Sequence, residues 1–203
     1  MFPLFFGSTL RRVHIYIDGN NMLGSLASLG VDGHHFDYRQ YFSDLMGQQQ
    51  KIQKITYYGA VFPQQISKEK YQCDMGFYNF LRSAPQAIEV KLGQFKINDG
   101  YPVEKGVDVQ LATDLIFNAF YNNYDDAYIC SADSDLLPAV REVKRNFKEK
   151  KIFAIAAHGR GMVQRSYDQI VRIFPNKAKK YWIRREPNLA SLEMLQAKFP
   201  PRK

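Results

Sequence analysis

Three short segments place aspartates where carboxylates could do chemistry together. Asp18 follows an apolar stretch, Asp108 and Asp114 lie in KGVDVQLATD, and Asp133 and Asp135 flank a serine in SADSDLLPAV. Clustered carboxylates repel one another and are costly to remove from water, so such a cluster needs a compensating cation. Ligand sets made only of oxygen suit Mg²⁺ or Mn²⁺, which activate water and stabilise charge in phosphoryl displacement. We therefore expect these five aspartates to hold such an ion.

The elements predicted around these segments would bring the acids to one place. Residues 13–17 and 127–130 are short apolar stretches typical of buried strands. Strands and helices alternate along the chain, which predicts an α/β fold with a mostly parallel central sheet and helices on both faces. Ligands bind such folds outside the carboxyl ends of the strands. Asp18 and Asp133 both follow such an end closely, so we expect them at the same edge of the sheet.

Periodicity and capping signals predict the other elements. Helices are expected at 38–46, 68–83, 107–121, 134–147 and 189–197, with Asp37 and Ser67 as caps of the first two. Strands are expected at 54–62, 87–92, 152–156 and 169–174, with a hairpin around the Asp-Gly turn at 99–100.

Each aspartate also has an ordinary structural explanation. Asp108 and Asp114 lie six residues apart on the predicted helix 107–121, so they project about 120° apart. Asp108 can be a stabilising acid in the first turn. Asp114 interrupts an apolar stretch, which favours a functional role or a buried, paired one. The convergence of three separate segments on one edge favours a site over three unrelated structural roles.

Charge distribution points to an anionic partner. The 203-residue chain has a net charge of +8, and residues 160–203 account for all of it with 11 Lys or Arg and 3 Asp or Glu. This asymmetry predicts binding to nucleic acid first and to a membrane surface second, whereas a solvated tail is the alternative. The densest cluster is Lys177, Lys179, Lys180, Arg184 and Arg185. We expect Tyr181 and Trp182, which lie within it, to stack on bases.

Composition limits the class of protein. Apolar residues make up 45% of the chain, enough for a substantial core, and the length suits one domain with an appendage. No apolar run reaches the roughly 18 residues that cross a bilayer, and the start does not have the pattern of a signal peptide. Two cysteines far apart in sequence indicate a reducing compartment. We therefore expect a cytoplasmic protein with no membrane-spanning segment.

The three acidic segments together resemble a known family. YIDGNNM at 16–22, KGVDVQLATDL at 105–115 and SADSDLLPAV at 131–140 look like the three signature segments of the NYN domain. That domain is the LabA-like branch of the PIN-like nuclease superfamily. The resemblance covers residues 11–174 and leaves residues 175–203 as a basic C-terminal extension. It implies a Rossmann-like PIN fold and metal-dependent cleavage of RNA.

The resemblance also implies roles for individual residues. The catalytic acids would be Asp18, Asp108, Asp133 and Asp135, with Asp114 as a further metal ligand. Asn21 matches the asparagine that follows the first acid, and Ser131 and Ser134 match small hydroxyl positions that shape the last loop. Many PIN domains carry another acid on an early helix, for which Asp44 and Asp74 are candidates here.

Two basic residues add to the predicted substrate site. Lys105 lies three residues before Asp108, and Arg160 lies among glycines after a predicted strand, so both can contact a phosphate. The residues expected to bind substrate are therefore Asn21, Lys105, Ser131, Ser134 and Arg160.

Two functions from different classes fit these observations. The first is a metal-dependent ribonuclease, and the second is a non-catalytic RNA-binding or regulatory module on the same fold. The acids favour the ribonuclease, because a pure RNA binder gains nothing from an anionic pocket facing phosphates. Haloacid-dehalogenase phosphatases are disfavoured because Asn20 stands where they need an aspartate, and the chain has no G-x-G-x-x-G dinucleotide motif. The sequence leaves a homodimer open.

Overall fold

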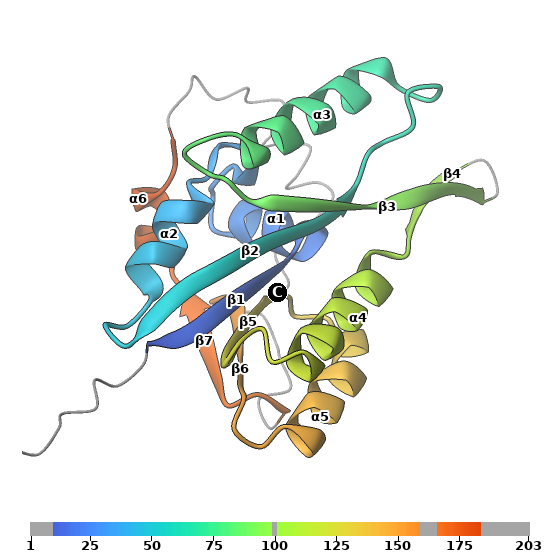
Figure 1. The fold of residues 1–203 in the computed structure, drawn as a ribbon. Coiled ribbons are helices and arrows are strands. Elements are labelled where there is room, and N and C mark those ends of the chain that lie inside the picture. Colours follow the sequence, from blue (N-terminus) through green and yellow to red (C-terminus); the bar gives the residue numbers. More distant parts are fainter. Residues whose placement is uncertain (1–9, 99–100, 159–165, 184–203) are drawn as a thin grey trace, which may run out of the picture.

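The computed structural model describes residues 10–98, 101–158 and 166–183, and it has an α/β architecture (Figure 1). The predicted helix 189–197 lies outside these residues. The strands are β1 (Arg11–Asp18), β2 (Gln50–Ala60), β3 (Glu89–Asn98), β4 (Tyr101–Lys105), β5 (Asp126–Cys130), β6 (Lys151–Ala157) and β7 (Gln169–Ile173). The helices are α1 (Gly19–Ser28), α2 (Tyr38–Leu45), α3 (Lys68–Arg82), α4 (Val107–Phe120), α5 (Leu137–Asn146) and α6 (Pro175–Lys180), with 3₁₀ turns η1 (Gly33–His35) and η2 (Ser134–Leu136).

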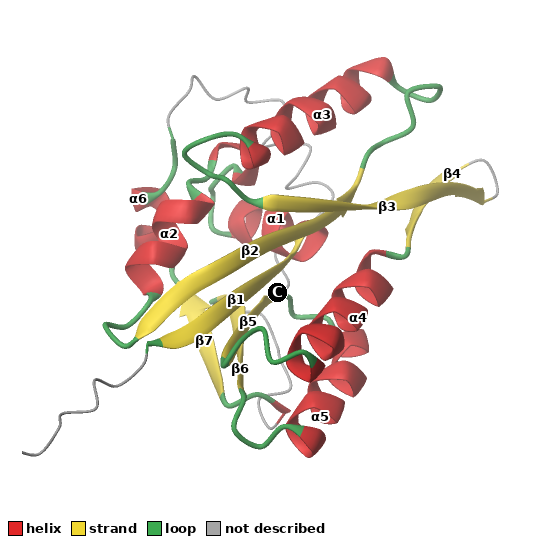
Figure 2. Ribbon diagram, in the orientation of Figure 1, coloured by secondary structure: helices red, strands yellow, loops and turns green. Residues whose placement is uncertain are grey.

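The described strands form one sheet in the order β4-β3-β2-β1-β5-β6-β7 (Figure 2). All neighbouring strands are parallel except β3 and β4, which form an antiparallel hairpin at one edge. Every residue of β5 is buried, as expected for a central parallel strand that is covered on both faces. The predicted mostly parallel α/β sheet is confirmed.

Helices cover both faces of the sheet (Figure 1). On one face, α1, α2, α3 and α6 pack on a core that includes Ile15, Ile17 and Tyr57. On the other face, α4 and α5 pack on a second core that includes Tyr16 and Ile129. The side chains of β1 therefore alternate between the two cores, which puts Asp18 on the same face as Tyr16 and α4.

Capping residues in the sequence correctly predicted where two of the helices begin. The Asp37 carboxylate accepts a hydrogen bond from the Gln40 amide at 3.0 Å, and the Ser67 hydroxyl accepts one from the Lys70 amide at 3.3 Å. Both predicted caps are confirmed. The predicted strand 87–92 and the first arm of the hairpin are one continuous strand, β3. Its first half pairs with β2 and its second half extends past β2 to pair with β4.

Residues 175–183, which we assigned to the basic extension, pack against the domain. The Asp37 amide donates to the Tyr181 carbonyl at 2.8 Å, and the Ile183 amide donates to the His35 carbonyl at 2.7 Å. Tyr181 is 5% exposed and its ring contacts Phe36 and Tyr41. The predicted stacking of Tyr181 on bases is therefore wrong, because the ring is buried against the core of the domain.

Across the described ranges, no helix combines the length and the apolar character needed to span a bilayer.

Candidate active site

The sheet has a switch point between β1 and β5. From β1 the chain proceeds to β2 and β3 on one side, and it later returns to place β5, β6 and β7 on the other side. The crevice at the carboxyl ends of such strands is where open parallel sheets bind ligands. Ile17 pairs with Cys130, so Asp18 and Ser131 lie level with each other at these ends. The expectation that the first and last acidic segments share one edge is confirmed.

Asp18 is buried and firmly held at this edge. Its carboxylate accepts hydrogen bonds from the Asn21 backbone amide at 3.1 Å, the Asn21 side-chain amide at 2.6 Å and the Ser131 hydroxyl at 2.7 Å. The first of these bonds caps α1, so the helix begins directly after the strand. Burial raises the pKa of Asp18, the hydrogen bonds oppose this effect, and the charge of Asp133 raises it further.

The loop after β5 is tied to Asp18 through side chains. The Ser131 hydroxyl donates to Asp18 and accepts from the Asp133 amide at 3.0 Å. The Asn21 side-chain oxygen accepts from the Ala132 amide at 3.3 Å. The Asp133 carboxylate accepts from the Asp135 amide at 2.9 Å and so caps η2. Asn21 and Ser131 thus hold the acids in place, whereas their predicted contact with substrate stays a prediction.

Asp108 joins this group of acids from the first turn of α4. It is exposed in the first turn of α4, which begins after Gly106 in the left-handed conformation at φ +85°. Neighbouring protein atoms still remove part of the water around its carboxylate, which raises the pKa of Asp108, and the negative charges of Asp18, Asp133 and Asp135 raise it further. The structure therefore brings four of the five predicted aspartates close enough together to repel one another.

Asp114 is held elsewhere. Its carboxylate accepts hydrogen bonds from the Tyr58 hydroxyl at 2.6 Å and from the Lys91 ammonium at 2.7 Å. These contacts join α4 to β2 and β3 and neutralise the charge of Asp114. Of the two roles that its apolar neighbours favoured, the structure shows the paired one, with the side chain half-buried rather than fully buried. Its predicted role as a metal ligand is not supported, because its charge is already compensated by a lysine.

The remaining predicted site residues differ in how close they lie to the four aspartates. Lys105 is exposed at the end of β4, and Ser134 is exposed at the start of η2. Arg160 lies outside the described residues. The two candidate early-helix acids make structural contacts: Asp44 accepts from Lys180 and Tyr181, and Asp74 accepts from the Phe62 amide at 2.7 Å.

Sequence reasoning missed one residue near the acids. Tyr167 is buried just before β7, and burial, followed by the charge of Asp133, raises the pKa of its phenol to about 12. Its hydroxyl therefore stays protonated at neutral pH beside the acidic group. No motif in the sequence marks Tyr167, since it lies far from Asp133 along the chain.

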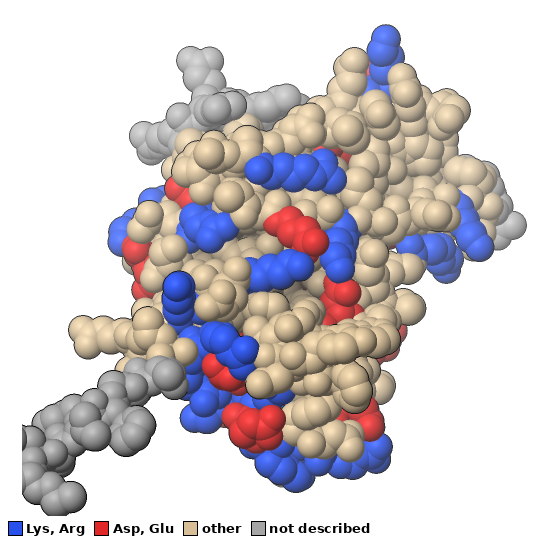
Figure 3. All heavy atoms as spheres, viewed as in Figure 1, with Lys and Arg blue, Asp and Glu red and all other residues tan. Residues whose placement is uncertain are grey.

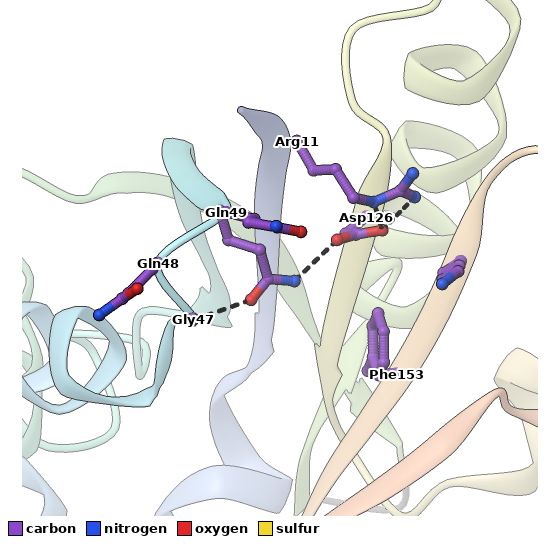
Figure 4. Close-up of a pocket in the computed structure, with 8 residues that line it drawn as sticks. Arg11, Gly47, Gln48, Gln49, Asp126 and Phe153 are labelled. Atoms are coloured by element: carbon purple, nitrogen blue, oxygen red, sulfur yellow. Dashed lines mark hydrogen bonds and ion pairs between the residues drawn. The ribbon is translucent and has the colours of Figure 1, made fainter. Parts of the chain in front are cut away.

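A pocket of about 490 Å³ lies at the opposite edge of the sheet (Figure 4). Its lining includes Arg11, Gln50, Asp126 and Lys151, which are the first residues of β1, β2, β5 and β6. The buried Asp126 carboxylate forms an ion pair with Arg11 and accepts from the Gln50 amide at 2.7 Å. Its charge is therefore satisfied within the protein, which leaves the acids at the carboxyl edge as the candidate active site.

A mostly parallel α/β sheet with carboxylates gathered at its switch point is consistent with a PIN-like fold. The family model of the NYN domain matches residues 12–173, so the chain belongs to the NYN family, which is part of the PIN-like nuclease superfamily. The resemblance found in the sequence is thereby confirmed.

A solved structure supports the fold. The chain is similar to the crystal structure of a protein of unknown function from Vibrio parahaemolyticus, with a TM-score of 0.61 and 20% identity. The similarity covers 81% of this chain and 94% of that chain. A search of curated proteins found no match.

The donor set suits a hard divalent cation. Among the described residues, no three His, Cys, Asp or Glu side chains form a ready-made metal-binding group. Asp18, Asp108, Asp133 and Asp135 nevertheless supply only oxygen ligands. A bound cation would relieve the repulsion that, after desolvation, raises the pKa of Asp108. These four residues would hold Mg²⁺ or Mn²⁺.

The raised pKa of Asp108 predicts how its loss affects stability without divalent ions. A carboxyl whose pKa is raised by folding stabilises the protein below its unfolded pKa of about 3.9, and this contribution is lost as the pH rises through the folded pKa. Asp108→Asn in chelator should therefore melt no lower than wild type at pH 7. The difference should disappear as the pH falls toward about 4.

Glu69→Gln is the matched control, since Glu69 is also a first-turn acid, on α3. A backbone hydrogen bond, followed by one from Ser67, lowers the pKa of Glu69. Its replacement should therefore leave the melting temperature unchanged or lower it. A clearly lower melting temperature for Asp108→Asn at pH 7 would contradict the prediction.

Proposed function

We propose that the protein is a metal-dependent ribonuclease that hydrolyses RNA phosphodiester bonds. One observation carries the proposal: Asp18, Asp108, Asp133 and Asp135 gather at the switch point of the sheet, where partial desolvation, followed by the charges of the other three acids, raises the pKa of Asp108. Membership of the NYN family supports it, because that family belongs to the PIN-like nucleases.

The residues of the site divide the work according to their contacts. Bound Mg²⁺ or Mn²⁺ would activate water and stabilise the charge that develops on the phosphate. Asp18 has a fixed orientation because Asn21 and Ser131 donate to it, so it would anchor the ion. Asp108 is exposed and lies within electrostatic reach of Asp18, Asp133 and Asp135, so it would complete the ligand set of the ion. Lys105, exposed beside the first turn of α4, would contact a substrate phosphate.

A non-catalytic RNA-binding module remains the second candidate. The observation that favours it is the lack, within the described residues, of three side chains already arranged around a metal position. The two functions differ in whether the acids are needed for cleavage or only tolerated near the RNA.

One experiment separates the two candidates. The purified full chain is incubated with single-stranded RNA, structured RNA and DNA in Mg²⁺, in Mn²⁺ and in chelator. We expect RNA cleavage that requires the metal, is lost in Asp108→Asn and is retained in Glu69→Gln. RNA binding without metal-dependent cleavage, equal in wild type and Asp108→Asn, would instead establish the binding module.

We also propose that exposed lysines of α6 contact the RNA backbone. Lys177 and Lys179 are exposed on this helix, which follows the carboxyl end of β7, whereas Lys180 pairs with Asp44 at 3.0 Å. Arg184 and Arg185 lie outside the described residues. Lys177→Gln combined with Lys179→Gln should flatten the dependence of log K on log salt by about 1.4, because each single-strand phosphate contact contributes about 0.7.

Fluorescence anisotropy with labelled single-stranded RNA over a range of salt concentrations measures this slope. The matched control replaces Lys148 and Lys151, two exposed lysines near the start of β6 at the other edge of the sheet. The control should bind with the slope of wild type. Equal slopes in wild type, the α6 variant and the control would show that the α6 lysines do not contact the RNA.

A cytoplasmic location is part of this proposal. Both cysteines are free thiols, Cys73 exposed and Cys130 buried, which is what a reducing compartment maintains.

A further inference from the structure

The outward face of α4 carries an exposed aromatic cluster. Val109, Phe117, Phe120 and Tyr121 are 70%, 54%, 67% and 65% exposed. The Phe117 and Tyr121 rings are stacked with centroids 6.2 Å apart, and Phe120 meets Tyr121 edge-on at 5.3 Å. Figure 3 shows an area of uncharged surface where Figure 1 draws the lower half of α4. The Phe117, Phe120 and Tyr121 rings thus form one exposed apolar area, and such areas mark surfaces that another segment or molecule covers.

The start of β1 lies next to the C-terminal end of α4, where this aromatic face ends. The Arg12 guanidinium donates to the Asn122 backbone carbonyl at 2.6 Å and to the Asn122 side-chain oxygen at 2.9 Å. The Asp125 amide donates to the Arg12 carbonyl at 2.8 Å. These contacts fix the first residues of β1 against the turn that follows α4. Residues 1–9 precede this strand, whose Arg12 contacts Asn122, the residue after Tyr121.

The composition and length of residues 1–9 match the aromatic face. The segment MFPLFFGST contains Phe2, Leu4, Phe5 and Phe6 and has no charged side chain. Nine extended residues span at most about 30 Å, and a helix of the length of α4 spans about 21 Å. The segment is therefore long enough to run along the whole face. We propose that residues 1–9 dock in cis on the outward face of α4.

The other terminal segment fits this face less well. Residues 184–203 follow Ile183, whose amide donates to the His35 carbonyl. His35 belongs to the layer of α1, α2 and α6, which covers the opposite face of the sheet from α4. Residues 184–203 also contain five Lys or Arg, and charged side chains are costly to bury on an aromatic surface. The lack of charged side chains and the point where it joins the domain therefore both favour residues 1–9 over residues 184–203.

Chymotrypsin cleavage within the full chain tests the docking. Mass spectrometry follows the cut after Leu4, Phe5 or Phe6 in wild type and in the face variant Phe117→Ala with Phe120→Ala. Both replaced residues are exposed and alanine favours helix, so the variant should fold. Docking limits access of the protease to residues 1–9, so we expect this cut to be at least about tenfold faster in the face variant.

Ile66→Ala is the matched control, because Ile66 is also an exposed apolar residue but precedes α3. Its N-terminal cut should proceed at the wild-type rate. Equal rates in wild type and the face variant would overturn the proposal. Two further measurements test whether a second copy of the chain covers the face instead. Light scattering gives the oligomeric state, and the cleavage rate is measured again after about a hundredfold dilution. Protection that is lost on dilution, with a dimer that the face variant abolishes, would overturn it in favour of a second copy of the chain.

Discussion

Asp18→Asn should cleave RNA about a thousandfold more slowly than wild type, whereas Ser131→Ala should be slower by about ten- to hundredfold. The first change removes a buried carboxylate that anchors the ion, and a loss of about 4 kcal/mol in transition-state stabilisation corresponds to a thousandfold. The second change keeps every acid but removes the hydroxyl that links Asp18 to the Asp133 amide. Single-turnover cleavage at saturating Mn²⁺ measures both effects.

Controls must separate lost chemistry from lost structure. In Asp18→Asn an amide nitrogen replaces one carboxylate oxygen and faces an N–H of Asn21 in either orientation, so thermal melting has to show that the variant is folded at the assay temperature. Ser28→Ala removes a hydroxyl that bonds the Ser25 carbonyl within α1 and should cleave RNA like wild type. An Asp18→Asn protein that is folded and fully active would exclude Asp18 from the chemistry.

Local signals were sufficient for most of the fold. The buried strands β1 and β5 follow from short apolar stretches, and α2 and α3 begin where a capping side chain stands three residues before a free backbone amide. The helix α6 was missed because its lysines resemble a solvated tail. It is fixed by distant residues: Tyr181 packs against Phe36 and Tyr41, and Lys180 pairs with Asp44. Contacts of that range leave no pattern in the local sequence.

The sequence predicted the part of the site that follows from the direction of the strands. Asp18 and Asp133 were expected at one edge, because parallel strands place their carboxyl ends there, and they lie close together because β1 and β5 are neighbours in the sheet. The partners of Asp114 were hidden, since Tyr58 and Lys91 lie on strands whose order in the sheet the sequence does not state. The bridging position of Ser131 likewise depends on the register between β1 and β5, which places its hydroxyl level with Asp18.

Gly19→Ala should destabilise the protein by about 3 kcal/mol, because the site motif leaves no room for a side chain directly after Asp18. A Cβ atom at Gly19 would lie 2.6 Å from a ring carbon of Tyr57 and 2.7 Å from the Tyr58 carbonyl oxygen. Tyr57 is fully buried and the carbonyl belongs to β2, so neither can move without disturbing the sheet.

The same clash should also reach the active site, because a displaced Gly19 moves the start of α1 and with it the amide of Asn21 that fixes Asp18. Gly76→Ala supplies the control, since a Cβ there meets nothing within 4 Å in the exposed middle of α3. That change should stabilise the protein by up to about 1 kcal/mol. Urea denaturation of the three proteins measures both shifts, and a Gly19→Ala midpoint equal to that of wild type would mean that β2 yields to the added methyl group.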